Sequence, residues 1–180
     1  MKVSIITRHA VPNYGSVLQS YATQKTFEAL GYDAEILDYI RYDERGKESV
    51  STNCHIGRNG IKNKLKRAVY FCLQYPNSQK MNSAFAQFRR QYLRLSNTSY
   101  GSLEELKKQP PEADLYVTGS DQVWGKIGTE EVDPAYFLQY APEGKPRIAY
   151  SASFGKTELP KELTEGMNDL LEGYSALLVR

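Results

Sequence analysis

The sequence predicts an α/β protein in which helices flank a mostly parallel sheet. Short runs of apolar, β-prone residues occur at 2–7, 34–39, 113–118 and 147–153, and segments with helical periodicity lie between them. These runs are apolar at consecutive positions, as is typical of strands that are covered on both faces. With 180 residues, of which 41% are hydrophobic, the chain is long enough for one domain of this kind.

Residues 2–39 are predicted to form a β-α-β unit. A loop at 8–15 follows the first strand, and Ser16 with Gln19 has the form of a capping box, so we expect the helix to start at Ser16 and to stop at Gly31. A right-handed crossover makes the two strands parallel. No G-x-G-x-x-G motif is present, which argues against NAD and FAD. The expected apolar face of the helix consists of Leu18, Tyr21, Ala22, Ala29 and Leu30.

The next segment is polar and then helical. Residues 41–60 contain three glycines and no periodicity, and we interpret them as a surface loop that is mobile or forms a lid. The helical segment at 61–95 is divided by Pro76, so we expect two helices whose apolar stripes face the core. The stripes are Ile61, Leu65, Ala68, Val69 and Cys72 in the first helix, and Met81, Ala84, Phe85, Phe88, Tyr92 and Leu95 in the second.

The remainder of the chain alternates short helices and strands. A helical turn at 103–108 is stopped by Pro110 and Pro111, and the strands at 113–118 and 147–153 follow. We also expect a short extended piece at 136–140, a helix at 159–171 and a last strand at 176–179. Because this last strand is apolar up to the terminus, we expect the chain to be the front part of a longer protein.

Charge and composition exclude several classes of function. The formal net charge of +2 is too small to indicate a nucleic-acid-binding protein. No signal sequence and no run of ~20 apolar residues is present, so we expect a soluble, cytoplasmic protein. The two cysteines and two histidines lack metal-ligand spacing, and we expect no metal site. Two basic clusters fit solvated helix faces better than a polyanion-binding patch: Lys62, Lys64, Lys66 and Arg67, and the pair Arg89-Arg90.

Three of the predicted strands are followed by small and polar residues. If the strands are parallel, these tails meet at one edge of the sheet, where ligands bind in open α/β folds. The first tail leads into a predicted helix, whose free N–H groups at Ser16 suit an anion or a sugar hydroxyl, with simple capping as the alternative. The tails are Asn13-Tyr14-Gly15-Ser16, Gly119-Ser120-Asp121-Gln122 and Ser151-Ala152-Ser153-Phe154-Gly155.

Asp121 is the candidate catalytic residue in this arrangement. Gly119 lets the backbone turn sharply after the strand, so that Asp121 projects into the cleft with Ser120 and Gln122 beside it. The alternative is a turn in which Asp121 only caps the next segment. Tyr14, Trp124 and Tyr150 flank the predicted cleft, where their rings could stack on a sugar or, alternatively, close the core.

Five ordered sequence blocks carry a resemblance to a known family, the polysaccharide pyruvyl transferases. The resemblance implies a Rossmann-like sheet and two such domains facing across a cleft, in the manner of GT-B glycosyltransferases. Residues 1–180 would be the N-terminal domain, and the C-terminal domain would lie outside this chain. The blocks are Asn13-Tyr14-Gly15-Ser16-Val17-Leu18-Gln19-Ser20-Tyr21-Ala22 with Gln24, Gly31-Tyr32 with Leu37-Asp38-Tyr39, Gly119-Ser120-Asp121-Gln122-Val123-Trp124, Tyr136-Phe137-Leu138, and Ala149-Tyr150-Ser151-Ala152-Ser153-Phe154-Gly155.

The family's reaction moves a pyruvyl group from phosphoenolpyruvate to two sugar hydroxyls of a cell-surface polysaccharide, forming a cyclic ketal. The resemblance implies that Asp121 is the base or fixes the acceptor hydroxyls, and that no cofactor is needed besides the donor substrate. Arginine and histidine residues of the family's second domain, which hold phosphoenolpyruvate, have no counterpart here, so we expect the isolated chain to be inactive. The expected substrate-binding residues are Asn13, Tyr14, Gly15, Ser16, Gly119, Ser120, Gln122, Trp124, Ser151, Ser153 and Gly155.

Other functions stay open from sequence alone. One is a glycosyltransferase of the same two-domain design that uses a nucleotide sugar, and another is a non-catalytic module that binds a partner protein. The resemblance implies a sugar or glycan acceptor and allows peripheral association with membranes that carry lipid-linked glycans. It does not name the acceptor sugar, its linkage or the oligomeric state.

Overall fold

The computed structural model describes residues 1–41, 64–125, 132–155 and 161–179. Its centre is a six-stranded sheet in which all paired strands are parallel, in the order β3-β2-β1-β4-β5-β6. This is the Rossmann-like α/β architecture that the sequence predicts. The strands are β1 (Lys2–Ile6), β2 (Asp33–Tyr39), β3 (Leu95–Tyr100), β4 (Leu115–Thr118), β5 (Arg147–Ala152) and β6 (Ala176–Val179).

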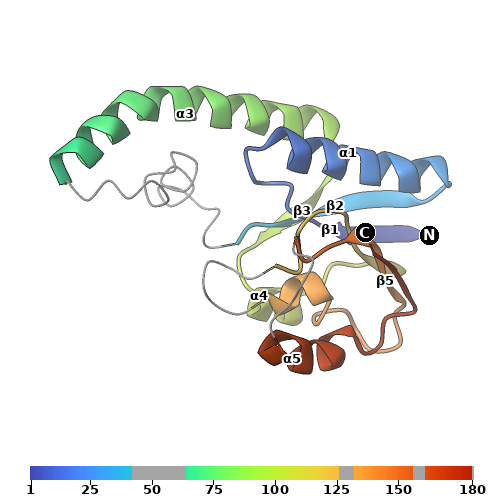
Figure 1. The fold of residues 1–180 in the computed structure, drawn as a ribbon. Helices are drawn as coiled ribbons and strands as arrows, with labels where there is room; N and C mark the ends of the chain where they lie inside the picture. Colours follow the sequence, from blue (N-terminus) through green and yellow to red (C-terminus); the bar gives the residue numbers. More distant parts are fainter. Residues whose placement is uncertain (42–63, 126–131, 156–160, 180) are drawn as a thin grey trace.

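Helices cover both faces of the sheet (Figure 1). On one face α1 (Tyr14–Ala29) packs on the strands and α3 (Lys64–Tyr92) forms an outer layer over α1. The other face carries α4 (Leu103–Lys108), the 3-10 helix η2 (Pro134–Phe137) and α5 (Lys161–Leu171). Two hydrophobic cores result, one on each side of the sheet.

The smaller core lies under α1 and joins Phe27 to strand residues such as Ile5 and Val117. The larger core lies between the sheet and the helices α4, η2 and α5, and it contains Trp124 and Phe137. Strands covered on both faces bury consecutive residues, which explains the runs of buried positions in β1, β2 and β4.

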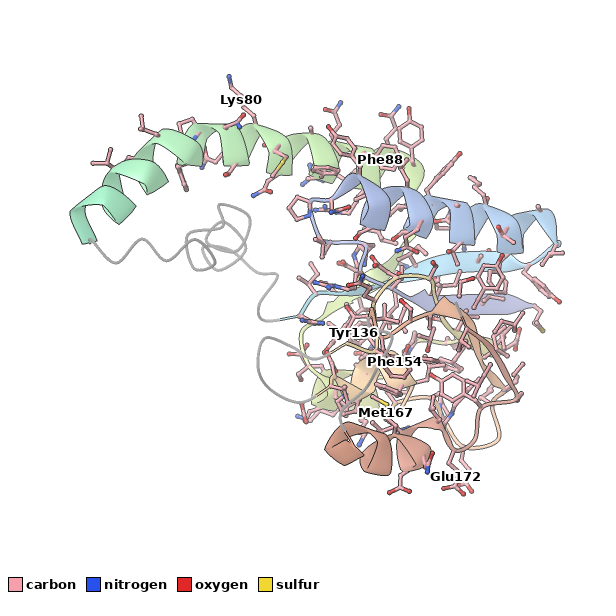
Figure 2. The ribbon with its side chains drawn as sticks, in the orientation of Figure 1. Lys80, Phe88, Tyr136, Phe154, Met167 and Glu172 are labelled. Atoms are coloured by element: carbon pink, nitrogen blue, oxygen red, sulfur yellow. The ribbon has the colours of Figure 1, made fainter. Side chains whose placement is uncertain are left out.

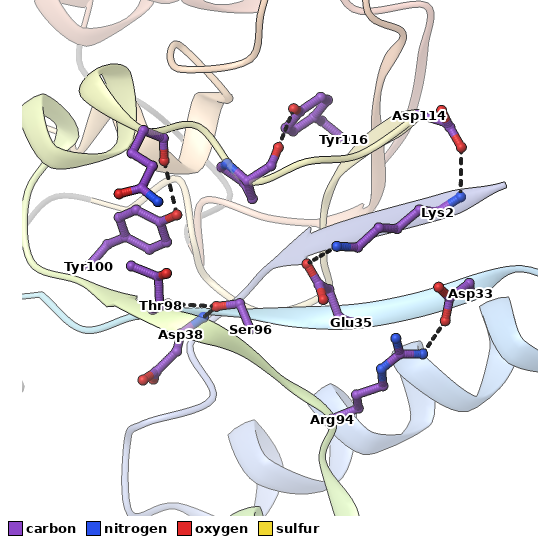
Figure 3. Close-up of polar contacts among 12 residues, drawn as sticks. Lys2, Asp33, Glu35, Asp38, Arg94, Ser96, Thr98, Tyr100, Asp114 and Tyr116 are labelled. Atoms are coloured by element: carbon purple, nitrogen blue, oxygen red, sulfur yellow. Dashed lines mark hydrogen bonds and ion pairs between the residues drawn. The ribbon is translucent and has the colours of Figure 1, made fainter.

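Polar pairs fasten the amino ends of the strands (Figure 3). The Lys2 ammonium lies 3.3 Å from the Glu35 carboxylate on β2, and the Lys2 amide donates to Asp114 Oδ2 at 2.8 Å. Arg94, just before β3, pairs with Asp33 at the start of β2. The amino edge is therefore closed by complementary charges, whereas the tails of small and polar residues lie at the carboxyl edge.

Helix α1 begins and faces the sheet differently from the prediction. Its N-cap is Asn13, whose Oδ1 accepts from the amides of Gly15 and Ser16 at 2.7 and 3.4 Å, so the predicted start at Ser16 is wrong. The predicted apolar face is also wrong, since Leu18 and Leu30 are exposed. The residues that α1 buries are Val17, Ser20, Thr23, Gln24 and Phe27.

Helix α3 is continuous where two helices were predicted. Pro76 lies inside it, and Leu95, predicted as helical, is the first residue of the edge strand β3, which the prediction missed. The expected core stripe is buried only at Phe85, while Ala84 and Tyr92 remain exposed. In the first predicted stripe, residue 61 and the side chains of residues 65 and 68 are not described by the structure. The same is true of most of the predicted loop 41–60.

Two further predictions are corrected near the end of the chain. Residues 136–140 do not form an extended piece, because η2 covers 134–137 and Leu138 adopts a left-handed conformation. The last strand, β6, is present at the predicted place, but it is an exposed edge strand rather than a buried one. The strands and helices predicted at 2–7, 34–39, 103–108, 113–118 and 147–153 are confirmed within one or two residues.

Gly119 offers a test of how closely β1 and β4 must approach. A Cβ at this position would lie 3.1 Å from both Ile5 Cγ2 and Thr7 Cβ. We expect Gly119→Ala to lower the free energy of unfolding by about 1–3 kcal/mol, because the strands must move apart. Urea denaturation followed by circular dichroism measures this.

The matched control is Gly166→Ala in α5, where an added Cβ meets no atom within 4 Å. This change is expected to leave stability unchanged or to raise it by about 0.5–1 kcal/mol. Equal effects of the two substitutions on stability would show that the close approach of β1 and β4 does not require glycine at position 119.

Candidate functional site at the carboxyl edge of the sheet

The three tails predicted to converge lie at one edge of the sheet. Two of them follow the strands β4 and β5, and the third contains the start of α1. β4 lies between β1 and β5, and all three run in the same direction. The tails of β4 and β5 are in direct contact, since the Ser153 amide donates to the Asp121 carbonyl at 3.0 Å and Asp121 bridges to Ala152. The strand order reverses between β1 and β4, which is where open α/β sheets leave a crevice for ligands.

Thr7 connects the Asn13–Ser16 tail to the tails of β4 and β5. Its hydroxyl donates to the Ser120 carbonyl at 2.7 Å and accepts from Gln19 Nε2 at 2.8 Å. The same Gln19 nitrogen donates to the Ser16 carbonyl at 2.9 Å. Since Thr7 is fully buried, this chain of hydrogen bonds fixes the first turns of α1 against the ends of β1 and β4. Neither Thr7 nor Gln19 was among the predicted site residues.

Asp121 has an unusual backbone and one unoccupied carboxylate oxygen. Its φ is 121°, in the region that side-chain-bearing residues rarely adopt. Oδ1 accepts from the Gln122 amide at 2.7 Å, so the residue does cap its own turn. Oδ2 is buried and has no hydrogen-bond partner in the described structure, as is also true of Gln19 Oε1. One oxygen is thus structural, and the other is available to a ligand.

The start of α1 is a capped helix terminus. The Asn13 side chain occupies the amides of Gly15 and Ser16, so capping accounts for the groups that the sequence offered as an anion site. Tyr14 is 76% exposed, and its ring meets Phe85 of α3 edge to face, with centroids 5.0 Å apart. Asn13 and Gly15 are also exposed. Tyr14 is therefore the predicted aromatic residue whose ring remains accessible.

The tail of β5 supports the Asp121 loop. Ser151 has a φ of 57° and lies where the register between β5 and β6 shifts. The Ser153 hydroxyl donates to the Asp121 carbonyl at 3.2 Å and is nearly buried, so its role in this structure is to hold the loop. Gly155 has a φ of 69°, and a Cβ there would lie 2.5 Å from Gln122 Cδ. The positive φ favours glycine at this position, and any larger residue would also displace the Gln122 side chain.

Trp124 is a core residue and not a stacking platform. It is 1% exposed, stacks on Phe137 with centroids 5.4 Å apart, and donates from Nε1 to the Tyr136 carbonyl at 3.1 Å. Phe154 also packs on it, in the layer between the sheet and α5 (Figure 2). The expectation that its ring stacks on a sugar is corrected. Tyr150 packs on Phe27, and its ring is likewise engaged.

A buried histidine and a carboxylate lie at the same edge, and the sequence analysis missed them. His9 Nε2 is 2.9 Å from Asp38 Oδ1, and Nδ1 is 3.3 Å from the Thr7 carbonyl. Both ring nitrogens therefore lie close to oxygen atoms of neighbouring residues. Nearby, Arg89 donates to the Ala10 carbonyl at 3.3 Å, and burial lowers the pKa of its guanidinium. The signal available in the sequence was His9 itself, a titratable residue three positions after the end of β1.

The surroundings of Asp38 set its titration. Burial acts to raise the pKa of this carboxyl, but hydrogen bonds from His9 and Ser99 and the charge interactions with His9 and Arg89 outweigh it. The pKa of Asp38 is therefore lower than its ordinary value.

Among the described residues, no group of three or more His, Cys, Asp or Glu side chains could hold a metal ion. None of the helices in the described ranges has the length and apolar composition of a membrane span.

The pKa of Asp38 leads to a pH-dependent prediction. Because its pKa is lower in the folded than in the unfolded state, Asp38 stabilises the fold at pH values above about 4, and this contribution is lost as the pH falls through the folded-state pKa. We expect Asp38→Asn to cost about 1–3 kcal/mol at neutral pH, since His9 loses its charged partner. The difference from the unsubstituted protein should shrink below about pH 4, as urea denaturation at several pH values would show.

Asp169→Asn on the exposed face of α5 serves as the control and is expected to change stability by less than about 0.5 kcal/mol. If the loss of stability in Asp38→Asn stayed constant down to the lowest pH at which both proteins fold, the lowered pKa of Asp38 would not be the source of its contribution.

Comparison with known proteins identifies the family. The sequence model of the family described as Polysaccharide pyruvyl transferase matches residues 13–180, which include all three tails at the carboxyl edge. The search of curated proteins and the search of solved structures each returned no significant match. Because the match covers nearly the whole chain, the chain belongs to the polysaccharide pyruvyl transferase family.

Proposed function

We propose that the chain forms the acceptor-binding side of a transferase that moves a pyruvyl group from phosphoenolpyruvate to two hydroxyls of a sugar in a cell-surface polysaccharide. Membership of the family supports a pyruvyl transferase with a polysaccharide acceptor. In the proposed arrangement, a second Rossmann-like domain faces the carboxyl edge of this sheet, as in GT-B enzymes. The acceptor sugar would lie against the edge described above.

The observation that carries the proposal is the pair of unoccupied acceptors at this edge. Asp121 Oδ2 and Gln19 Oε1 are buried and lack hydrogen-bond partners within the described ranges. Buried acceptors that lack partners cost free energy until a donor arrives. Sugar hydroxyls are such donors. Phosphoenolpyruvate is an anion with few donors, and a carboxylate would repel it.

The same argument disfavours a nucleotide sugar at this edge. A nucleotide diphosphate needs N–H donors or cations, which helix N-termini commonly supply. Here the amides of Gly15 and Ser16 are occupied by Asn13, and the neighbouring free groups are acceptors. The edge therefore fits a neutral, hydroxyl-bearing ligand better than a diphosphate.

The proposed chemistry requires a base. Each of two sugar oxygens forms a bond to C2 of phosphoenolpyruvate, the bond from C2 to the phosphate oxygen breaks, and C3 becomes a methyl group. Of the two hydroxyl protons, one ends on C3 and the other on the departing phosphate. Asp121 Oδ2 would accept the proton of an attacking hydroxyl and pass it on.

The other predicted residues have positioning roles in this proposal. Ser120 and Ser153 fix the Asp121 loop, and Gln122 is exposed beside it. The cationic groups that hold the donor's carboxylate and phosphate would come from the facing domain. The nearby His9 is fully buried, and both of its ring nitrogens are engaged.

Replacing the carboxylate tests the role of Asp121 as a base. In the full protein, Asp121→Asn keeps the shape of the side chain and removes its ability to accept a proton. We expect the rate of ketal and phosphate formation to fall by about 100-fold or more, because general base catalysis contributes factors of this size. Phosphate release and mass spectrometry of the glycan measure the loss. Asp169→Asn is the control, and a near-normal rate for Asp121→Asn would refute the assignment.

Asp121→Gly separates function from stability. Glycine adopts a φ of 121° freely, and the change also removes the buried oxygen that lacks a partner. We therefore expect the free energy of unfolding to stay the same or to rise by about 1–2 kcal/mol, while ketal formation is lost. Thermal and urea unfolding measure the first effect. A clear loss of stability would indicate that the hydrogen bond to Gln122 outweighs the strain.

A further inference from the structure

Helix α3 differs in charge from the rest of the chain. It contains six of the 23 Lys and Arg residues and none of the 21 Asp and Glu residues. The remaining 151 residues therefore carry 17 basic against 21 acidic side chains. A positive helix attached to an otherwise acidic protein is complementary to a negatively charged surface.

The N-terminal half of α3 extends beyond the carboxyl edge of the sheet (Figure 1). The ring contacts that hold α3 on α1 come from its C-terminal half, where Phe85 meets Tyr14 and where Phe88 and Tyr92 meet Tyr21. The N-terminal half follows a sequence rich in apolar and aromatic residues, Leu65-Lys66-Arg67-Ala68-Val69-Tyr70-Phe71-Cys72-Leu73-Gln74-Tyr75.

One face of this half combines exposed apolar residues with a cation. Val69, Leu73, Pro76 and Lys80 recur at the spacing that places residues on one side of a helix. Val69 is 53% exposed and Leu73 is 72% exposed. The Lys80 side chain points away from the body of the protein (Figure 2), so the face that these residues share is directed outwards.

An apolar groove adjoins this face. It has a volume of about 630 Å³ and lies between α1 and the middle of α3, with Leu18, Met81 and Phe88 among its lining residues. Lys80 lies at this groove as well, and it is the charged residue among those that line it. The outward face and the groove together give α3 an apolar surface with Lys80 beside it.

We propose that α3 binds the surface of an anionic lipid bilayer, with Val69 and Leu73 of its N-terminal half in the interface. A basic helix with exposed apolar residues fits this partner, because acyl chains accept the apolar side chains and anionic headgroups attract the cations. The bilayer would then lie against the side of α3 that is turned away from α1 and the sheet (Figure 2). This binding does not depend on the chemistry proposed for Asp121.

Co-sedimentation of the full protein with vesicles tests the proposal. We expect binding to vesicles containing about 30% phosphatidylglycerol and much weaker binding to phosphatidylcholine alone. Raising the salt from about 0.1 to about 1 M should release the protein, because the Debye length falls from about 10 to about 3 Å. Equal binding to both vesicles, or none to the anionic ones, would overturn the proposal.

Matched variants locate the surface. Leu73→Glu should weaken binding by about tenfold or more through lost apolar burial, and Lys80→Glu by about fivefold or more. Leu30→Glu, which replaces a similarly exposed leucine at the far end of α1, and Lys107→Glu on α4 should change binding by less than about twofold. All four positions are exposed, so circular dichroism should report folded proteins.

Two results would contradict the assignment of this surface to a bilayer. One is that the control variants weaken binding as much as the α3 variants. The other is that Leu73→Glu leaves vesicle binding unchanged but converts a dimer to a monomer in sedimentation velocity, which would make this face an interface between copies of the chain. Ketal formation on a water-soluble acceptor should persist in Leu73→Glu, which separates this proposal from that for Asp121.

Discussion

The parallel pairing of β1 with both β2 and β4 is the constraint on which the carboxyl edge depends. β1 hydrogen-bonds to β2 on one side and to β4 on the other, so the strand order reverses beside it. The pairing with β4 continues past the strand ends, where the Gly119 amide donates to the Ile6 carbonyl at 2.8 Å and the Thr7 hydroxyl donates to Ser120. Gln19 then fastens α1 to Thr7. Because these contacts all involve Ile6 or Thr7 at the end of β1, the position of β1 sets the positions of β4 and α1.

The aromatic core supports the edge from behind. Trp124 follows Asp121 by three residues, and its indole is held by Phe137, Phe154 and the Tyr136 carbonyl. A well-packed anchor of this kind resists rearrangement of the loop that precedes it. It thereby allows Asp121 to keep a φ of 121°, a conformation that costs about 1–3 kcal/mol. The burial of Trp124, which removes it as a ligand for sugar, gives it this supporting role.

The sequence was sufficient to predict β1, β2, β4, β5 and β6 and the convergence of the tails, because these strands are rich in apolar, β-prone residues and the tails that follow β4 and β5 are small and polar. It was insufficient wherever a residue had two possible partners. Ser16 and Asn13 are both good N-caps, and Gln19, which suggested the capping box, bonds to Thr7 instead. α1 lies between the sheet and α3, so its face is not marked by a single apolar stripe. The His9–Asp38 pair joins residues 29 positions apart, and spacing carries no signal for it.

Backbone strain and an unpartnered carboxylate oxygen coincide at Asp121, which argues for function at the carboxyl edge. At the amino edge, Lys2 and Arg94 meet acidic partners, and the local charges are satisfied. At the opposite edge, Asp121 and Ser151 adopt positive φ values on neighbouring chain segments. Asp121 also holds a buried oxygen that has no partner among the described residues. Each such feature costs about 1–3 kcal/mol. Glycine at either position would relieve the strain, so stability alone does not account for these side chains. Local rules are broken in this way mainly where a ligand supplies the missing interactions.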